Sequence, residues 1–211
     1  MDNPWNDISL SDYENHMSLD SVQQLQVLNE IMKIQFEAFP FKSAMILGVA
    51  GGNGLEHVSK DVFDVVYGVD INEDYLKQTE ARYPELCRIL KCLKIDLINE
   101  AEKLPKAELV IANLLVEYIG LDVFCEVIKR VEPKVASCVI QINTDEKAWV
   151  SESPYLHAFD RLDEVHHQMD EKTFCEYMGK IGYTKASMQR FDLPNGKALI
   201  KMDFTNADNV I

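Results

Sequence analysis

The chain has 211 residues, of which 47% are hydrophobic and 27% are charged, and its formal net charge is -14 at pH 7. This length and composition predict one globular domain with a full hydrophobic core. The acidic excess is spread along the chain and argues against binding that depends on neutralising phosphates, so we expect no nucleic-acid partner.

The cysteines and the first residues indicate the compartment. The chain has five cysteines, an odd number, and no CxxC pair, which argues against a disulfide framework and a zinc ribbon. The first residues lack the basic and apolar segments of a signal peptide, and no apolar run approaches the ~20 residues that a membrane span needs. We therefore expect a cytoplasmic monomer or homodimer without a membrane partner.

Residues 1–40 are predicted to form an N-terminal arm and a helix. Residues 1–20 are polar, with scattered aromatic side chains. Apolar residues then recur at three- and four-residue spacing, which places them on one helix face. This face consists of Val22, Leu25, Leu28, Met32, Phe36 and Phe39. Ser18 or Asp20 is a suitable N-cap, and Pro40 ends the helix.

Residues 41–211 are predicted to form one domain in which strands and helices alternate. The first five expected strands span residues 43–49, 62–69, 89–95, 108–112 and 135–142. The expected helices span residues 55–60 and 72–83, and a third is capped by Asp122 and ended by Pro133. The connection at 96–106 is too short for more than one or two helical turns. Continuous apolar strands of this kind are typical of a parallel sheet buried on both faces.

The last third of the chain changes its pattern. Residues 143–169 are irregular and rich in aromatic and polar side chains, and a helix capped by Asp170 and closed by Gly182 follows. Two strand-like runs, 183–191 and 197–204, flank the turn sequence Leu193-Pro194-Asn195-Gly196. This predicts an antiparallel hairpin at the end of an alternating α/β chain.

The first predicted strand runs directly into the glycine cluster Gly48-Val49-Ala50-Gly51-Gly52-Asn53-Gly54. Glycine lets the backbone turn at positive φ and approach a ligand closely. Together with Asp70, near the end of the next strand, the cluster indicates a nucleotide-type site. Ala50 and Asn53 stand where a dinucleotide fingerprint requires glycine, and no lysine follows as in a P-loop. The loop therefore suits a ligand that lacks a pyrophosphate.

This loop, the order of elements and the terminal hairpin resemble the class I S-adenosylmethionine-dependent methyltransferases. The resemblance covers roughly residues 20–205. It implies an α/β fold with a Rossmann-like, doubly wound sheet of seven mostly parallel strands and a C-terminal antiparallel hairpin. It also implies S-adenosyl-L-methionine as the cofactor and methyl transfer to a small-molecule acceptor by in-line displacement. The chain departs from the family pattern in its Asn-Gly, where Thr-Gly is frequent, and in its short third crossover.

The resemblance assigns roles by position at the carboxyl ends of the strands. It places Asp70 on the ribose hydroxyls, where an acceptor-only carboxylate suits a diol. It places Ile71 beside the adenine, Asp96 on the adenine amino group, the Leu97 N–H on the ring, and Asn113 beside the transferred methyl. The cofactor-binding residues implied in this way are Gly48, Ala50, Gly51, Gly52, Gly54, Asp70, Ile71, Asp96, Leu97 and Asn113.

Each of the three polar residues also has a purely structural interpretation. Asp70 can cap the following helix, and Asp96 can be a turn residue. Asn113 can cap a helix that starts at Leu114. The family's signature for amino-nitrogen acceptors is absent, because Leu114 and Leu115 follow Asn113.

The acceptor side offers candidates but no clear base. Tyr13 and His16 lie in a segment that forms either a lid over the cofactor or a surface arm, and Trp5 is expected to anchor packing. Residues 143–169 are expected to build the acceptor pocket, with candidates Trp149, Tyr155, His157, His166 and His167. Adjacent histidines point apart, so we expect no metal site. The catalytic candidates are Asn113, Tyr13, His157 and His166.

Two competing hypotheses remain. The first is a protein that binds S-adenosylmethionine or S-adenosylhomocysteine without transferring a methyl group. The second is a nicotinamide-dependent dehydrogenase, against which the loop sequence and the terminal hairpin count. An enclosed acceptor cavity would favour an enzyme over a binding protein.

Overall fold

The computed structural model describes residues 3–143, 150–151 and 153–206, which form a seven-stranded sheet of order β3-β2-β1-β4-β5-β7-β6. The strands are β1 (Ser43–Leu47), β2 (Val65–Asp70), β3 (Leu90–Lys94), β4 (Leu109–Asn113), β5 (Val135–Ile142), β6 (Tyr183–Asp192) and β7 (Ala198–Asn206). Strands β1 to β5 pair in parallel, and β7 pairs antiparallel with both β5 and β6. The predicted mostly parallel sheet with a terminal hairpin is confirmed.

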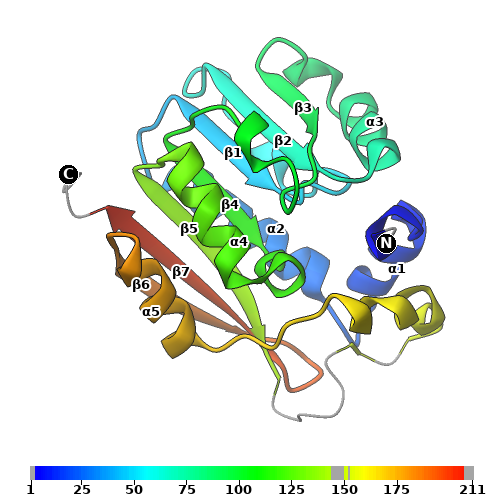
Figure 1. Ribbon diagram of the computed structural model, residues 1–211. Coiled ribbons are helices and arrows are strands. Elements are labelled where there is room, and N and C mark those ends of the chain that lie inside the picture. Colours follow the sequence, from blue (N-terminus) through cyan, green and yellow to red (C-terminus); the bar gives the residue numbers. More distant parts are fainter. Residues whose placement is uncertain (1–2, 144–149, 152, 207–211) are drawn as a thin grey trace.

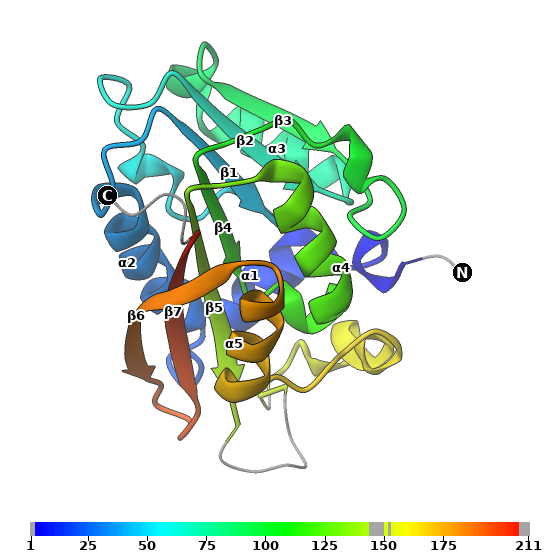
Figure 2. The same cartoon turned by 60° about the vertical axis from the view of Figure 1, so that its left-hand side comes forward.

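Helices cover both faces of the sheet (Figures 1 and 2). The α-helices are α1 (Leu10–Ser18), α2 (Gln24–Glu37), α3 (Glu73–Arg82), α4 (Val116–Val131) and α5 (Glu171–Lys180). Helices α2 and α3 share one core with the sheet, and α4 and α5 share the other. Strand β1 shows the division, because Ala44 and Ile46 enter the first core while Met45 and Leu47 enter the second. This alternation explains why the central strands are apolar throughout.

The start of α2 differs from the prediction. Ser18 is the last residue of α1, and its hydroxyl donates to the Asn15 carbonyl, so it caps no following helix. The chain turns at Leu19, whose carbonyl accepts from the N–H groups of Val22 and Gln23. Helix α2 then begins at Gln24, behind Gln23 at φ +51° and without a side-chain cap. The prediction of Ser18 or Asp20 as the N-cap was wrong.

Helix α4 begins earlier than predicted. It starts at Val116 and is broken at Gly120, whose φ of 77° and ψ of 159° are not helical. Asp122 lies exposed inside the helix rather than at its start, so the prediction of Asp122 as the N-cap was wrong. The hydrophobic spacing follows the helix after the break and gives no sign of the single turn before it.

The remaining elements agree more closely. Asn72 caps α3 and Asp170 caps α5 through their side chains. The predicted helix at 55–60 is only the 3-10 turn Leu55–His57, and the other 3-10 helices are η1 (Pro4–Asn6), η3 (Pro84–Leu86), η4 (Ala101–Lys103) and η5 (Leu156–Glu164). No helix in the ranges described combines the length and apolar composition that crossing a bilayer requires.

Two segments far apart in sequence meet at the carboxyl ends of the strands. The N-terminal η1 and α1 lie against η5, at the lower right of Figure 1. Ile8 packs with Phe159 and Leu162 in a small separate core, and Arg161 pairs with Asp7. These segments place additional side chains over the edge of the sheet where open α/β folds bind ligands.

Candidate active site

Two adjoining cavities open at this edge. The strand-end cavity lies at the carboxyl ends of β1 to β4, and its lining includes Gly48, Asp70 and Asp96. The arm cavity lies beside it, between the N-terminal arm, the start of α4, the end of β5 and the segment before α5. Four residues line both cavities, namely Trp5, Tyr13, Leu114 and Tyr118. A ligand in one cavity would therefore lie next to a ligand in the other.

The glycine cluster divides between ligand-facing and packing positions. Gly48 and Ala50 line the strand-end cavity, whereas Gly51, Gly52 and Gly54 are not among its lining residues. A Cβ on Gly52 would lie 2.8 Å from Tyr83 Cε2, and one on Gly54 would lie 2.5 Å from Met32 Cβ. Both glycines have φ above +80°. These glycines are needed where the loop packs on α2 and on the end of α3.

Ala50 holds the loop in an unusual conformation. Its φ of +47° is disfavoured for a residue with a Cβ. Its N–H donates to Asp70 Oδ2 at 2.9 Å, and its carbonyl accepts from Thr79 Oγ1 at 2.7 Å. These two hydrogen bonds fix the loop to β2 and α3. Strained backbone positions of this kind are often found at ligand sites, where surrounding contacts hold them in place.

Asp70 faces the strand-end cavity from the end of β2. Its Oδ2 accepts from Ala50 N, and its Oδ1 accepts from Asn72 N at 2.9 Å. The cap of α3 is Asn72, whose Oδ1 accepts from the N–H groups of Asp74 and Tyr75, so the interpretation of Asp70 as the cap was wrong. Burial raises the pKa of Asp70, against the opposing effect of the backbone N–H donors. The two oxygens of a carboxylate offer about four lone pairs, so Asp70 keeps acceptor capacity for a ligand beside its backbone donors Ala50, Ile71 and Asn72.

The loop after β3 supplies the other wall. Asp96 and Leu97 line the strand-end cavity, as does Ile71 from the loop after β2. Asp96 Oδ1 accepts from Ile98 N at 2.9 Å, and its Oδ2 accepts from Asn99 Nδ2 at 2.7 Å. Asp96 is therefore a turn residue that also lines the cavity, and its role toward the adenine amino group stays a prediction.

Asn113 lines the strand-end cavity, but its amide is bound to α2. It exchanges two hydrogen bonds with Gln35, each of 2.9 Å, and its Nδ2 also lies 3.2 Å from Met32 Sδ. Gln35 Nε2 also donates to Ser137 Oγ at 2.9 Å, and Ser137 Oγ donates to Asp203 Oδ1 at 2.6 Å. The Nδ2 group of Asn113 is held by these contacts, whereas its Oδ1 accepts only from Gln35 among the described residues, so its place beside the transferred methyl group stays a prediction. The alternative of a helix cap was wrong, because Leu115 occupies the N-cap position of α4.

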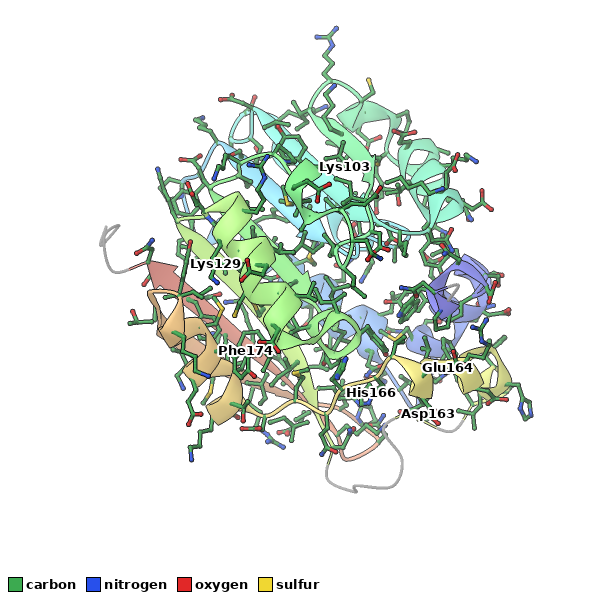
Figure 3. The ribbon with its side chains drawn as sticks, in the orientation of Figure 1. Lys103, Lys129, Asp163, Glu164, His166 and Phe174 are labelled. Atoms are coloured by element: carbon green, nitrogen blue, oxygen red, sulfur yellow. The ribbon has the colours of Figure 1, made fainter. Side chains whose placement is uncertain are left out.

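The arm cavity has a volume of about 240 Å³ and a mixed aromatic and polar lining. Tyr13 and His166, two of the predicted catalytic candidates, line it. His166 lies beside the first turn of α4, with its ring 5.9 Å from that of Tyr118 (Figure 3). His157 was a wrong candidate, because its side chain is 93% exposed beside Asp160 on the outer side of η5. Trp149 lies outside the described residues.

The residue that the sequence prediction missed is Glu117, in the first turn of α4. It lines the arm cavity and is only 5% exposed. Its Oε1 accepts from Gln141 N at 2.9 Å, and its Oε2 has no hydrogen-bond partner among the described residues. Burial raises the pKa of Glu117 to about 7. The available signal was an acidic residue inside the apolar run that follows the fourth strand, Leu114-Leu115-Val116-Glu117-Tyr118-Ile119.

Two further basic groups are buried near this cavity. His16 lines it, with Nδ1 2.7 Å from Ser153 Oγ and its ring 4.7 Å from that of Phe159. Burial lowers the pKa of His16, and nearby Lys197 lowers it further. Burial also lowers the pKa of Lys197 to about 8. His16 is therefore neutral at pH 7.

Comparison with family models gave no match, and comparison with curated proteins gave none either. Solved structures do match. The magnesium protoporphyrin IX methyltransferase of Synechocystis PCC 6803 with bound SAM gives a TM-score of 0.66 at 11% identity, over 98% of this chain and 98% of that enzyme. The geranyl diphosphate C-methyltransferase of Streptomyces coelicolor A3(2) gives a TM-score of 0.65 at 10% identity, over 88% of this chain and 81% of that enzyme.

A third structural neighbour carries the name of a cyclase. The cyclase SpnF gives a TM-score of 0.65 at 7% identity, over 88% of this chain and 82% of that protein. These likenesses show that the chain has the class I methyltransferase fold. Because the identities are low and the fold is shared by a cyclase, function has to be argued from the two cavities.

Proposed function

We propose that this protein is an S-adenosyl-L-methionine-dependent methyltransferase with a small-molecule acceptor. The observation that carries the proposal is the pair of adjoining cavities, which share four lining residues at their junction. A transferase for two substrates needs two such compartments that meet where the groups react. Structural neighbours with S-adenosylmethionine or S-adenosylhomocysteine bound lend support.

The strand-end cavity fits this cofactor by chemistry. Asp70 offers lone pairs suited to the ribose hydroxyls, and Asp96 offers an acceptor for the adenine amino group. A Cβ on Gly48 would lie 3.1 Å from Leu115 Cδ1, so glycine keeps this turn close to Leu115 without a clash. When bound, the cofactor supplies a methyl group activated by its sulfonium. The chain then has to orient both substrates and exclude water.

The N-terminal arm is proposed to be a lid. The strand-end cavity has a volume of about 90 Å³, below the roughly 300–1,000 Å³ of typical small-molecule sites. Asn3, Trp5 and Tyr13 of the arm contribute to its wall. Trp5 packs edge-on against Tyr118 with ring centroids 4.8 Å apart. We infer that the arm moves aside to admit the cofactor and closes again to shield the reaction from water.

The arm cavity favours an enzyme over a binding protein. Its enclosure by the arm and the segment before α5 provides the acceptor compartment that a protein limited to cofactor binding would not need. Residues 143–169 are accordingly proposed to be the acceptor-pocket insertion.

Calorimetric titration tests the proposal directly. We expect S-adenosylhomocysteine to bind with micromolar affinity or better and NAD to bind weakly or not at all. Tight NAD binding without S-adenosylhomocysteine binding would overturn the proposal in favour of a dehydrogenase. Binding of S-adenosylhomocysteine, with no methyl transfer to a broad panel of small acceptors, would favour the binding protein.

A further inference from the structure

We propose that Glu117 is the catalytic residue of the arm cavity, that it binds the nucleophilic nitrogen of the acceptor and takes its proton, and that the acceptor is a small amine. This inference rests on the proposed methyltransferase function. It names the class of acceptor and the base, which the resemblance to known methyltransferases left open.

The first observation is a buried carboxylate oxygen without a partner. One oxygen of Glu117 is fixed by Gln141 N at 2.9 Å, and the other has no donor within the described residues. Buried polar atoms are nearly always hydrogen-bonded, so an orphaned one on a side chain that lines a cavity points to a ligand. An N–H group of the methyl-accepting molecule would supply the missing hydrogen bond to this oxygen.

The second observation is the way in which the backbone holds Glu117 in place. Because Gly120 breaks the helix, the Glu117 carbonyl is available to accept from His167 N, at 2.6 Å. This hydrogen bond joins the first turn of α4 to the segment that carries His166 and Met169, both of which line the arm cavity. The same break therefore positions the carboxylate and closes the wall around it.

The third observation is the charge of the lining. Glu117 is the buried acidic residue of the lining of the arm cavity, and Asp170 also lines it while its carboxylate caps α5. No lysine or arginine occurs among the described lining residues, and Lys197 lies behind them near His16 and His166. The side chains that line the cavity also include four aromatic residues, Trp5, Tyr13, Tyr118 and Phe159. Electron-rich ring faces and carboxylates both attract a cation. This combination favours a protonated amine over an alcohol or an acid.

The protonation state of Glu117 agrees with this role. Burial raises its pKa to about 7, so the carboxylate is available as a base near neutral pH. The titratable groups around it are Tyr13 and His16 of α1, Tyr118 of α4, Cys138 of β5, His166, His167 and Asp170 before α5, and Lys197 beside the hairpin turn.

The reaction then balances without any other group. The ammonium acceptor gives one proton to Oε2 of Glu117, and its nitrogen regains a lone pair. That lone pair forms the new N–C bond while the C–S bond of the methyl donor breaks and its electron pair stays on sulfur. The products are a methylammonium ion, S-adenosylhomocysteine and a proton, which passes from Glu117 to solvent.

A matched pair of probes tests the inference by binding. We would titrate 2-phenylethylamine and 2-phenylethanol into the protein saturated with S-adenosylhomocysteine, because the two differ only in the nucleophile. The wild type is expected to bind the amine at least about 10-fold more tightly than the alcohol, as for one charge-assisted hydrogen bond. Glu117→Gln should remove this preference, and Glu117→Asp should retain part of it.

Glu126→Gln is the matched control, since Glu126 lies on the exposed face of the same helix and pairs with Lys129. It should keep the preference for the amine. Equal binding of both probes by the wild type, no binding of either at millimolar concentration, or an unchanged preference in Glu117→Gln would each overturn the inference. S-adenosylhomocysteine affinity, measured on the same samples, separates the two proposals, because its absence refutes the methyltransferase itself.

Discussion

The strand-end cavity and the arm cavity lie side by side, yet they are built differently. The strand-end cavity is made mainly by the loops after β1 to β4, so its shape follows from the sheet. The arm cavity combines α1, the break in α4, the end of β5 and the segment before α5. The strand-end cavity therefore depends on backbone geometry, while the arm cavity depends on contacts between distant segments.

The largest effect is expected where the backbone of the glycine loop meets α2. Gly54→Ala places a Cβ 2.5 Å from Met32 Cβ at a φ of +90°. We expect a loss of roughly 3–5 kcal/mol in unfolding free energy from strain and overpacking, measured by urea denaturation. Gly179→Ala is the control, because nothing lies within 4 Å of its added Cβ, and it should be neutral or slightly stabilising. A small loss at Gly54 would show that the loop tolerates side chains.

The next effect concerns the pH dependence of stability. The pKa of Glu117 is raised from 4.5 to about 7 in the folded protein, so the folded state holds this proton more tightly than the unfolded state does. Stability should therefore fall as pH rises from 4.5 and level off above about 7, by about 3 kcal/mol in total from this group. Denaturation of Glu117→Gln should lack this fall. Parallel pH profiles for the wild type and the variant would contradict the burial argument.

Cofactor affinity gives a smaller effect. Asp70→Ala should weaken S-adenosylhomocysteine binding by roughly 1–3 kcal/mol, because charge-assisted hydrogen bonds to the ribose are lost. Asp64→Ala, on the exposed turn before β2, is the matched control and should bind normally. Unchanged calorimetric affinity of Asp70→Ala would mean that Asp70 serves only to hold the Ala50 turn.

The smallest effect is expected at the lid. Trp5→Ala removes the ring that packs on Tyr118 and Tyr13, and it should speed release of S-adenosylhomocysteine about 10-fold, equal to about 1.4 kcal/mol. Stopped-flow displacement would measure this rate. A rate that matches that of the wild type would show that the arm is a fixed wall.

Sequence reasoning could predict the strand-end cavity better than the arm cavity, for a physical reason. Apolar runs, Asn72 and Asp170 report on local structure, and the loop residues of a parallel sheet meet at one edge by topology. Glu117 is buried where its carbonyl accepts from His167 N, 50 positions away, and no periodicity in the sequence reports this contact. The pairing of Asn113 with Gln35 spans 78 positions.

The exposed position of His157 shows the same limit. The region 143–169 is rich in aromatic and polar residues, but which of its described residues face inward depends on how η5 packs on the arm. Composition singled out the region, and only tertiary contacts could select the residues that line the arm cavity.

The polar chain that ends at Asp203 has a consequence for strand register. Asp203 accepts from Lys201 Nζ, from Ser137 Oγ and from Ser187 Oγ, and these serines are its direct partners on β5 and β6. Its neighbours Met202 and Phe204 belong to the opposite core, with α4 and α5.

A slip of β7 by one residue would turn Lys201 and Asp203 into that apolar core and leave both charges without the two serines. The buried pair thus excludes the wrong register of an antiparallel strand inserted between two others. Ser137 and Gln35 connect Asp203 to Asn113 by hydrogen bonds. The register of β7 therefore also fixes the position of Asn113 in the lining of the strand-end cavity.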